Sequence, residues 1–266
     1  MRLRNGNLTE AFERLDSAGG GVLEVPAGIH EIGPTAIDLE DYPNLRNNVT
    51  IRGEGPGASV FDLGRGDGDG FSLVDSAGSD VFYTEITGVG FQGERSGVLV
   101  RIGRDDFHDA YNSCKLHFQT NNGHPDAAAA CRLNHVLNSD HFGVHNANGG
   151  IALECRQVQF GGITGSVRSN RDVSMVFDGY SFANAIEWLN VEACMDGVAI
   201  RGRDCGLNRF GTLYGANVEG TLFSHEANVR TRIDIGFVGS NVERVDRLTA
   251  GSYSVGISNQ PFEYAT

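Results

Sequence analysis

Residues 9–32, TEAFERLDSAGGGVLEVPAGIHEI, decide the fold of this chain. The first half predicts a short amphipathic helix, because apolar residues recur at helical spacing at Leu8, Ala11, Phe12 and Leu15. Asn7 can serve as the N-cap, and the glycines at 19–21 end the helix where positive φ is needed. Residues 22–25 then predict a buried strand, and the Pro-Ala-Gly segment after it predicts a turn. A helix laid across a first open coil would cover an exposed sheet edge.

Short strands continue beyond this stretch, in VTIRGEGPGASVFDL at 49–63 and ITGVGFQG at 86–93. Three later segments share a shape, in which a cysteine and a cation precede alternating residues that end in a large apolar one; they begin at Cys114, Cys131 and Cys155. Their apolar ends recur about every 20 residues, as expected for the coils of a solenoid. We therefore expect the three cysteines and Phe160 to face inward. Strands are predicted near 22–25, 49–52, 59–62, 71–74, 81–91, 98–102, 114–119, 131–137, 151–160, 173–182, 186–191, 198–201, 213–218, 233–238 and 253–258.

The order of helix, glycine run and short strands resembles the N-terminal cap and first coils of the pectate-lyase-like superfamily. This resemblance implies an all-β fold, a single-stranded right-handed parallel β-helix (solenoid) with a short N-terminal capping helix. It implies one domain over 1–266, with the cap and first strands in 1–33 and a closing segment at 240–266. The superfamily includes polysaccharide lyases, polygalacturonase-type glycosidases and phage tailspikes, so the resemblance specifies a fold and a substrate tendency better than a reaction.

The amino-acid composition restricts the kinds of partner that the protein can bind. The formal charge of −13 and the single lysine, Lys115, argue against nucleic acid or an anionic membrane as a partner. The same charge favours a neutral or weakly acidic polysaccharide or oligosaccharide. Five cysteines without a CxxC pair are expected to be reduced core thiols. Residues 1–8 lack an apolar signal-peptide core and no stretch is long enough to span a bilayer, which leaves the compartment open.

Histidine and asparagine concentrate between residues 108 and 145, where six of the eight histidines fall. In stacked coils this stretch would form a polar ridge on one external face, suited to a glycan chain. Within it we predict Asp140, His141 and His145 as catalytic and His117 and His135 as substrate-binding. The alternative is that the asparagines form internal ladders and the histidines are solvated surface.

A second catalytic candidate is Asp196, in Cys194-Met-Asp-Gly-Val-Ala-Ile200. This segment is similar to the Asn-Thr-Asp-Gly motif of polygalacturonases, which implies a general-acid role for Asp196; the alternative is an ordinary turn. Further substrate contacts are predicted at Arg168 and Arg201, which can grip a uronate carboxylate, and at the aromatic platforms Tyr180 and Trp188. Core burial is the alternative for Trp188.

Three functions fit these residues. The first is polysaccharide cleavage, either by a hydrolase using Asp140 and Asp196 or by a lyase using a histidine base and an arginine. The second is a non-catalytic glycan-binding module such as a tailspike segment, in which case a homo-oligomer, a trimer, is expected. A sugar epimerase is the third. No cofactor is expected, although the Asp67-Gly-Asp69 loop allows calcium, and no zinc-binding spacing is present.

Overall fold

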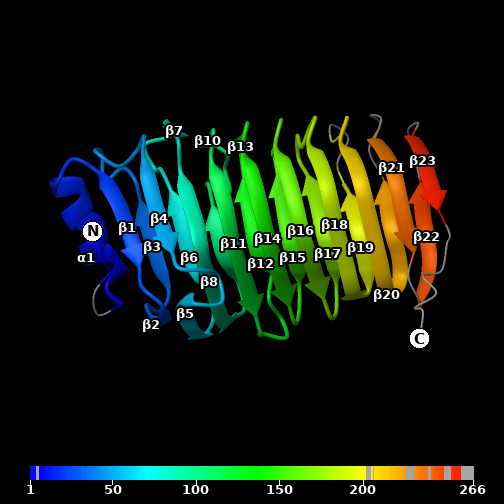
Figure 1. Ribbon diagram of the computed structural model, residues 1–266, viewed down its shortest axis with the longest axis horizontal. Coiled ribbons are helices and arrows are strands. Elements are labelled where there is room, and N and C mark those ends of the chain that lie inside the picture. Colours follow the sequence, from blue (N-terminus) through cyan, green and yellow to red (C-terminus); the bar gives the residue numbers. More distant parts are fainter. Residues whose placement is uncertain are drawn as a thin grey trace.

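The computed structural model describes residues 1–3, 6–201, 205, 207–225, 231–238, 241–248 and 253–258. It is a parallel β-solenoid of about 8 turns, with 5% of the chain in one short helix and 60% in strands. The strands stack side by side along the length of the molecule (Figure 1). The predicted all-β solenoid with an N-terminal helix is therefore confirmed.

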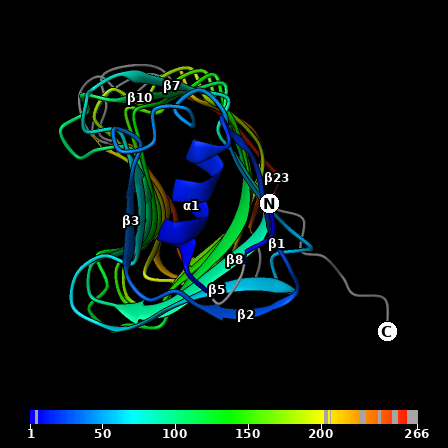
Figure 2. The same cartoon turned by 90° about the vertical axis from the view of Figure 1, so that its left-hand side faces the viewer.

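Helix α1 (Leu8–Ser17) lies across the first coil and covers its open end (Figure 2). The Asn7 side chain accepts a hydrogen bond of 3.0 Å from the backbone N of Glu10, which is the predicted N-cap. Phe12 is buried and packs edge-on against Tyr42, with ring centroids 5.6 Å apart. After the helix, glycines 19–21 all have positive φ. The amphipathic helix thus buries the apolar edge of the stack, as its sequence predicts.

Each full coil contributes strands to faces that run along the solenoid. One set of parallel strands runs the whole length of the solenoid, and we call it the first face. It consists of β1 (Gly21–Val25), β4 (Val49–Gly53), β8 (Glu85–Arg95), β11 (Lys115–Asn122), β14 (Asp140–Ala147), β16 (Gly162–Ser169), β18 (Ala185–Cys194), β20 (Arg209–His225), β21 (Thr231–Val238) and β23 (Tyr253–Ser258). Strands β2 (Gly28–Glu31) and β5 (Ser59–Gly66) extend this face beside the second half of β8.

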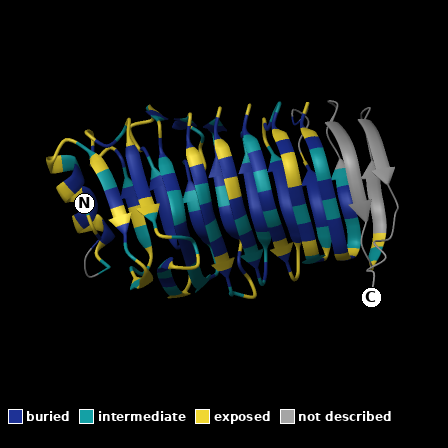
Figure 3. Ribbon diagram, viewed as in Figure 1, coloured by how far each residue is buried: buried dark blue, intermediate teal, exposed yellow. Residues whose placement is uncertain are grey.

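The other two faces close the coil. The second face contains β3 (Thr35–Asp38), β6 (Phe71–Val74), β9 (Val98–Ile102), β12 (Ala129–Asn134), β15 (Ile151–Arg156), β17 (Val173–Asp178), β19 (Asp196–Ile200), the second half of β20 and β22 (Val242–Leu248). The short third face contains β7 (Asp80–Phe82), β10 (Ala110–Asn112) and β13 (Val136–Leu137). Buried and exposed residues alternate along many of these strands (Figure 3), so each face has an inner and an outer surface.

The true repeat is slightly longer than the sequence suggested. On the first face His141 lies opposite Ile163, 22 positions later, and Ile163 lies opposite Ile186, 23 positions later. On the second face Cys131 pairs with Leu153, and Cys155 with Leu133. The two cysteines are therefore offset by two residues, which keeps both on the inner surface.

The predicted burial of the thiols is confirmed, whereas that of Phe160 is wrong. Cys114, Cys131 and Cys155 are all buried. Phe160 is 59% exposed, and its φ of +53° places it in the left-handed region at a corner. Its backbone breaks the strand alternation that the sequence pattern assumed, so the side chain points outward.

The corners are held by buried asparagines. Asn184 donates through Nδ2 to the carbonyl oxygen of Val158 at 2.7 Å and accepts from the backbone N of Gly161 at 3.0 Å. Asn208, one coil later, accepts from Asn184 Nδ2 at 3.0 Å. Such side chains satisfy backbone groups where the chain leaves one sheet for the next. In the histidine-rich segment, for which internal asparagines were the alternative interpretation, Asn122 and Asn134 are buried.

Candidate functional site

The outer surface of the first face carries two exposed aromatic side chains on one row. Strand pairing places Thr87, His117, Phe142, Thr164, Trp188 and Thr212 opposite one another in successive coils; we call them the aromatic row. Phe142 is 48% exposed and Trp188 is 43% exposed. The predicted platform residue Trp188 therefore lies at the surface and not in the core. The smaller Thr164 stands between the two rings in the row.

A carboxylate and an imidazole meet at this row. Asp140, the exposed first residue of β14, has Oδ2 2.8 Å from Nε2 of His117 on β11. The His117 ring stands edge-on to Phe142, with centroids 6.0 Å apart. Since both polar side chains are at least partly open to solvent, a ligand lying on the row can reach them. Two predicted site residues are thus brought together beside an aromatic ring.

The other two predicted catalytic residues of this segment lie inside the solenoid. His141 and His145 are 3% and 1% exposed, so the expectation that they form part of an external ridge is wrong. The cause is the alternation of β14: with Asp140 and Phe142 pointing outward, His141 and His145 must point inward. The remaining predicted histidine of the ridge, His135, lies at a corner, where Nδ1 is 2.8 Å from the carbonyl oxygen of Asp109.

The buried imidazoles form a stacked, hydrogen-bonded pair. Their rings are 5.0 Å apart with an interplanar angle of 13°, and the Nε2 atoms are 2.9 Å apart. Nδ1 of His145 lies 2.8 Å from the hydroxyl of Thr120. Burial lowers the pKa of His141 from 6.5 to about 4. Burial and the neighbouring His141 lower the pKa of His145 well below its ordinary value. Both rings are therefore neutral near pH 7 and have no access to a ligand on the outer surface.

The predicted Asp196 site lies on a different face. Asp196 is the first residue of β19 on the second face, and its Oδ1 accepts a 2.7 Å hydrogen bond from the backbone N of Thr221. This bond joins Asp196 to the next coil, so its carboxylate holds two coils together and does not close a local Asp-Gly turn. Arg201 follows the same strand, with its backbone N bonded to the carbonyl oxygen of Phe177. Asp140 and Asp196 therefore do not flank one position on the first face.

Tyr180 belongs to a separate aromatic cluster at a corner. Its ring stacks on Phe182, with centroids 5.7 Å apart and planes 11° apart, and Phe160 stands edge-on to Phe182 at 6.4 Å. Tyr180 and Phe160 are both exposed. The cluster is a second aromatic surface, distinct from the row that contains Trp188.

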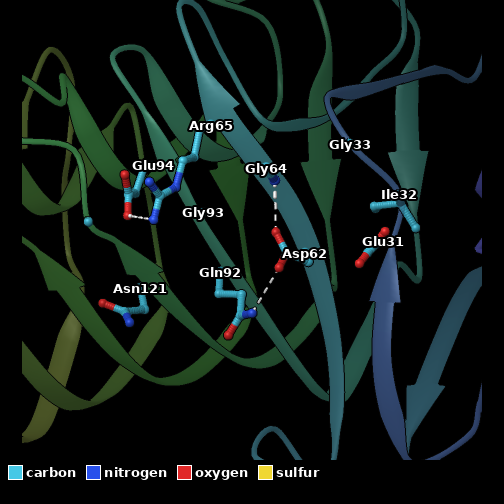
Figure 4. A pocket seen from close by; sticks show the side chains of 11 residues that line it. Glu31, Ile32, Gly33, Asp62, Gly64, Arg65, Gln92, Gly93, Glu94 and Asn121 are labelled. Carbon is cyan, nitrogen blue, oxygen red and sulfur yellow. Dashed lines mark hydrogen bonds and ion pairs between the residues drawn. The ribbon is translucent and has the colours of Figure 1, made fainter.

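Arg168 lies on the first face, at the end of a row of polar side chains. Pairing places Glu31, Asp62, Gln92, Asn121, Asn146 and Arg168 opposite one another; we call them the polar row. At the other end of this row a groove of about 780 Å³ opens over β2, β5, β8 and β11 (Figure 4). Sequence reasoning missed this groove and Phe142. Recognising residues 140–147 as a strand would have placed Phe142 beside His117.

Within the described residues, no group of three or more His, Cys, Asp or Glu side chains is placed to hold a metal. In the Asp67-Gly-Asp69 loop, which the sequence left open to calcium, the Asp69 carboxylate accepts from the backbone N of Val98 and forms an ion pair with Arg101. No helix among the described parts of the chain is long and apolar enough to cross a membrane.

Comparison with protein-family models, with curated proteins and with solved structures finds no match for this chain. The fold is therefore established by the strand pairing itself.

Proposed function

We propose that the protein binds a polysaccharide along the outer surface of the first face. The observation that carries this proposal is the exposure of Phe142 and Trp188 on one row, two strands apart. Two strand spacings amount to about 10 Å, so an extended oligosaccharide that crosses the strands can stack on both rings. The resemblance of the N-terminal segment to the pectate-lyase-like superfamily supports the same ligand class.

The polar surroundings suit a glycan as well. Asn190 and Ser166 lie beside the aromatic row on the same surface, with Asn190 Nδ2 3.4 Å from the Ser166 hydroxyl. His117 belongs to the row, and Asp140 lies beside it. Flat apolar rings flanked by hydroxyl, amide and carboxylate groups match the two kinds of surface that a sugar presents.

Binding can be measured directly, because Trp188 is the only tryptophan of the chain. A glycan that stacks on the row should change the fluorescence of Trp188, and Phe142→Ala should weaken binding roughly tenfold. Tyr83, which is 64% exposed at a corner, provides the control: Tyr83→Ala should bind as the wild type does. Equal affinity of the wild type and Phe142→Ala for every glycan bound would refute the proposal.

A second candidate function is cleavage of the bound glycan, favoured by the hydrogen bond between His117 and Asp140. A carboxylate that orients an exposed imidazole is a common arrangement for a general base. We expect His117→Ala and Asp140→Asn to lower turnover by about 10²-fold or more while Trp188 fluorescence still reports binding. A lyase would release an unsaturated, ultraviolet-absorbing uronate, and a hydrolase would release reducing ends only.

If the wild type binds a glycan but releases neither product from it, the function that remains is non-catalytic glycan binding. For that case we propose the oligomer expected of a tailspike-like segment, a trimer. Analytical ultracentrifugation measures it, and a monomer at all concentrations would contradict it.

A further inference from the structure

The groove at the start of the polar row differs from the aromatic row in chemistry. Its walls come from four adjacent strands, which present Glu31, Asp62, Gln92 and Asn121 in sequence across the surface. Glycines at its edges leave room, and Ile32 is the single apolar side chain in the lining (Figure 4). A volume of about 780 Å³ is in the range of small-molecule sites. Apart from Ile32, every lining side chain larger than glycine ends in a polar group, so a ligand that fills the groove has to satisfy hydrogen-bonding groups.

The polar groups in the groove are partly fixed and partly free. Asp62 accepts from the backbone N of Gly64 at 2.8 Å through Oδ1 and from Gln92 Nε2 at 3.1 Å through Oδ2. This contact leaves Gln92 Oε1 available as an acceptor. Within the described residues, the side chains of Glu31 and Asn121 form no hydrogen bond or ion pair. The groove therefore offers carboxylate acceptors together with amides that both donate and accept, which is the combination that hydroxyl groups need.

The charged side chains of the groove favour neutral sugars over acidic ones. The groove contains three carboxylates, of Glu31, Asp62 and Glu94, and one guanidinium, of Arg65. Arg65 is engaged by Glu94 at 3.0 Å. Since the Arg65 side chain is 82% exposed, this ion pair is weak, but a uronate that took Arg65 from Glu94 would still leave three carboxylates of the groove beside its own charge.

We propose that this groove is a subsite for a neutral, hydroxyl-rich sugar unit of the glycan that lies on the first face. This inference takes from the proposed function that the ligand is a glycan, and it adds that the sugar unit in the groove is neutral. The polar row leads out of the groove, since Asn121 pairs with Asn146 and Asn146 with Arg168. A chain or branch that leaves the groove thus remains on the same surface as Phe142.

An array of immobilised neutral, uronate-containing and amine-bearing oligosaccharides tests this subsite. We expect binding to neutral glycans, a roughly tenfold loss of affinity in Asn121→Ala and a roughly hundredfold loss in Gln92→Ala/Asn121→Ala. Asn47, an exposed asparagine outside the groove, provides the matched control, and Asn47→Ala should bind normally. Unchanged thermal midpoints in the groove variants would confirm that the change is local.

The outcomes separate this inference from the proposed function. Loss of binding in Phe142→Ala with none in the groove variants would refute the subsite and keep the aromatic row. The reverse pattern would refute the aromatic row alone. Binding confined to uronate-containing or amine-bearing glycans would overturn the neutral-sugar assignment, and no binding to any glycan would overturn both proposals.

Discussion

The buried pair His141 and His145 should make the protein sensitive to mild acid. In the folded chain burial lowers the pKa of His141 from 6.5 to about 4, and the pKa of His145 is lowered in the same direction. A histidine whose pKa is lowered on folding stabilises the fold fully above the unfolded pKa. That stability is lost as pH falls below it, because the unfolded chain binds the proton more readily.

The size of the effect follows from the shift. For His141 alone the difference between 6.5 and about 4 corresponds to about 3 kcal/mol once both states are protonated. About 2 kcal/mol of this should already be lost between pH 7.5 and pH 5. His145 adds to the loss, since a second charge beside the first would be buried without a counter-ion.

The test is urea unfolding at pH 7.5 and pH 5 of the wild type and of His141→Leu/His145→Val. The replacements match residues that face the same core rows in the neighbouring coils, since His141 pairs with Leu116 in the preceding coil and His145 pairs with Val167 in the next. Leaving the Thr120 hydroxyl without its partner shifts stability at both pH values alike, so the difference between them remains informative. The exposed His108 supplies the control variant His108→Gln. A double variant that loses as much stability between pH 7.5 and 5 as the wild type would refute this reasoning.

Three further predictions concern the interior. Gly143→Ala should destabilise the fold by about 1–3 kcal/mol in urea unfolding, because the added Cβ would lie 2.5 Å from His145 Nε2 and 2.6 Å from the carbonyl oxygen of Phe118; an unchanged midpoint would contradict this. Asn184→Ala should lower the free energy of unfolding by roughly 2–4 kcal/mol, since it leaves buried backbone groups without hydrogen-bond partners. Thermal unfolding measures the loss, and an unchanged stability would show that the corner asparagines do not stabilise the fold. Native-state alkylation should fail at the buried thiols, whose pKa values are raised by burial, and rapid labelling would count against the register at Cys114, Cys131 and Cys155.

The histidine-rich segment illustrates why parts of the solenoid are hard to recognise from sequence. The inward residues of β14 are His141, Gly143, His145 and Ala147, and those of β16 include Gly165 and Ser169. Neither strand shows the run of large apolar residues by which a buried strand is usually recognised. Gly143 is small because a stacked imidazole occupies the adjacent space. Packing against the coils before and after, and not local hydrophobicity, makes these segments strands.

The corners explain the error at Phe160. A left-handed residue there turns the chain by an amount that no alternating pattern anticipates, and the same conformation recurs at Ser113, Asn138 and Ala183. These positions share no residue type. Their backbone shape is imposed by the strands on either side.

The sequence by itself determined the capping helix, the repeated short strands and the inward cysteines, because each depends on local periodicity, capping or apolar character. The site depended on the tertiary structure. Whether His117 or His141 faces a ligand is decided by a one-residue difference in register, which turns a side chain from the surface to the core. The meeting of Asp140 with His117, and of Phe142 with Trp188 on one row, requires residues from successive coils to be stacked in register. Only the stacking of whole coils fixes that register.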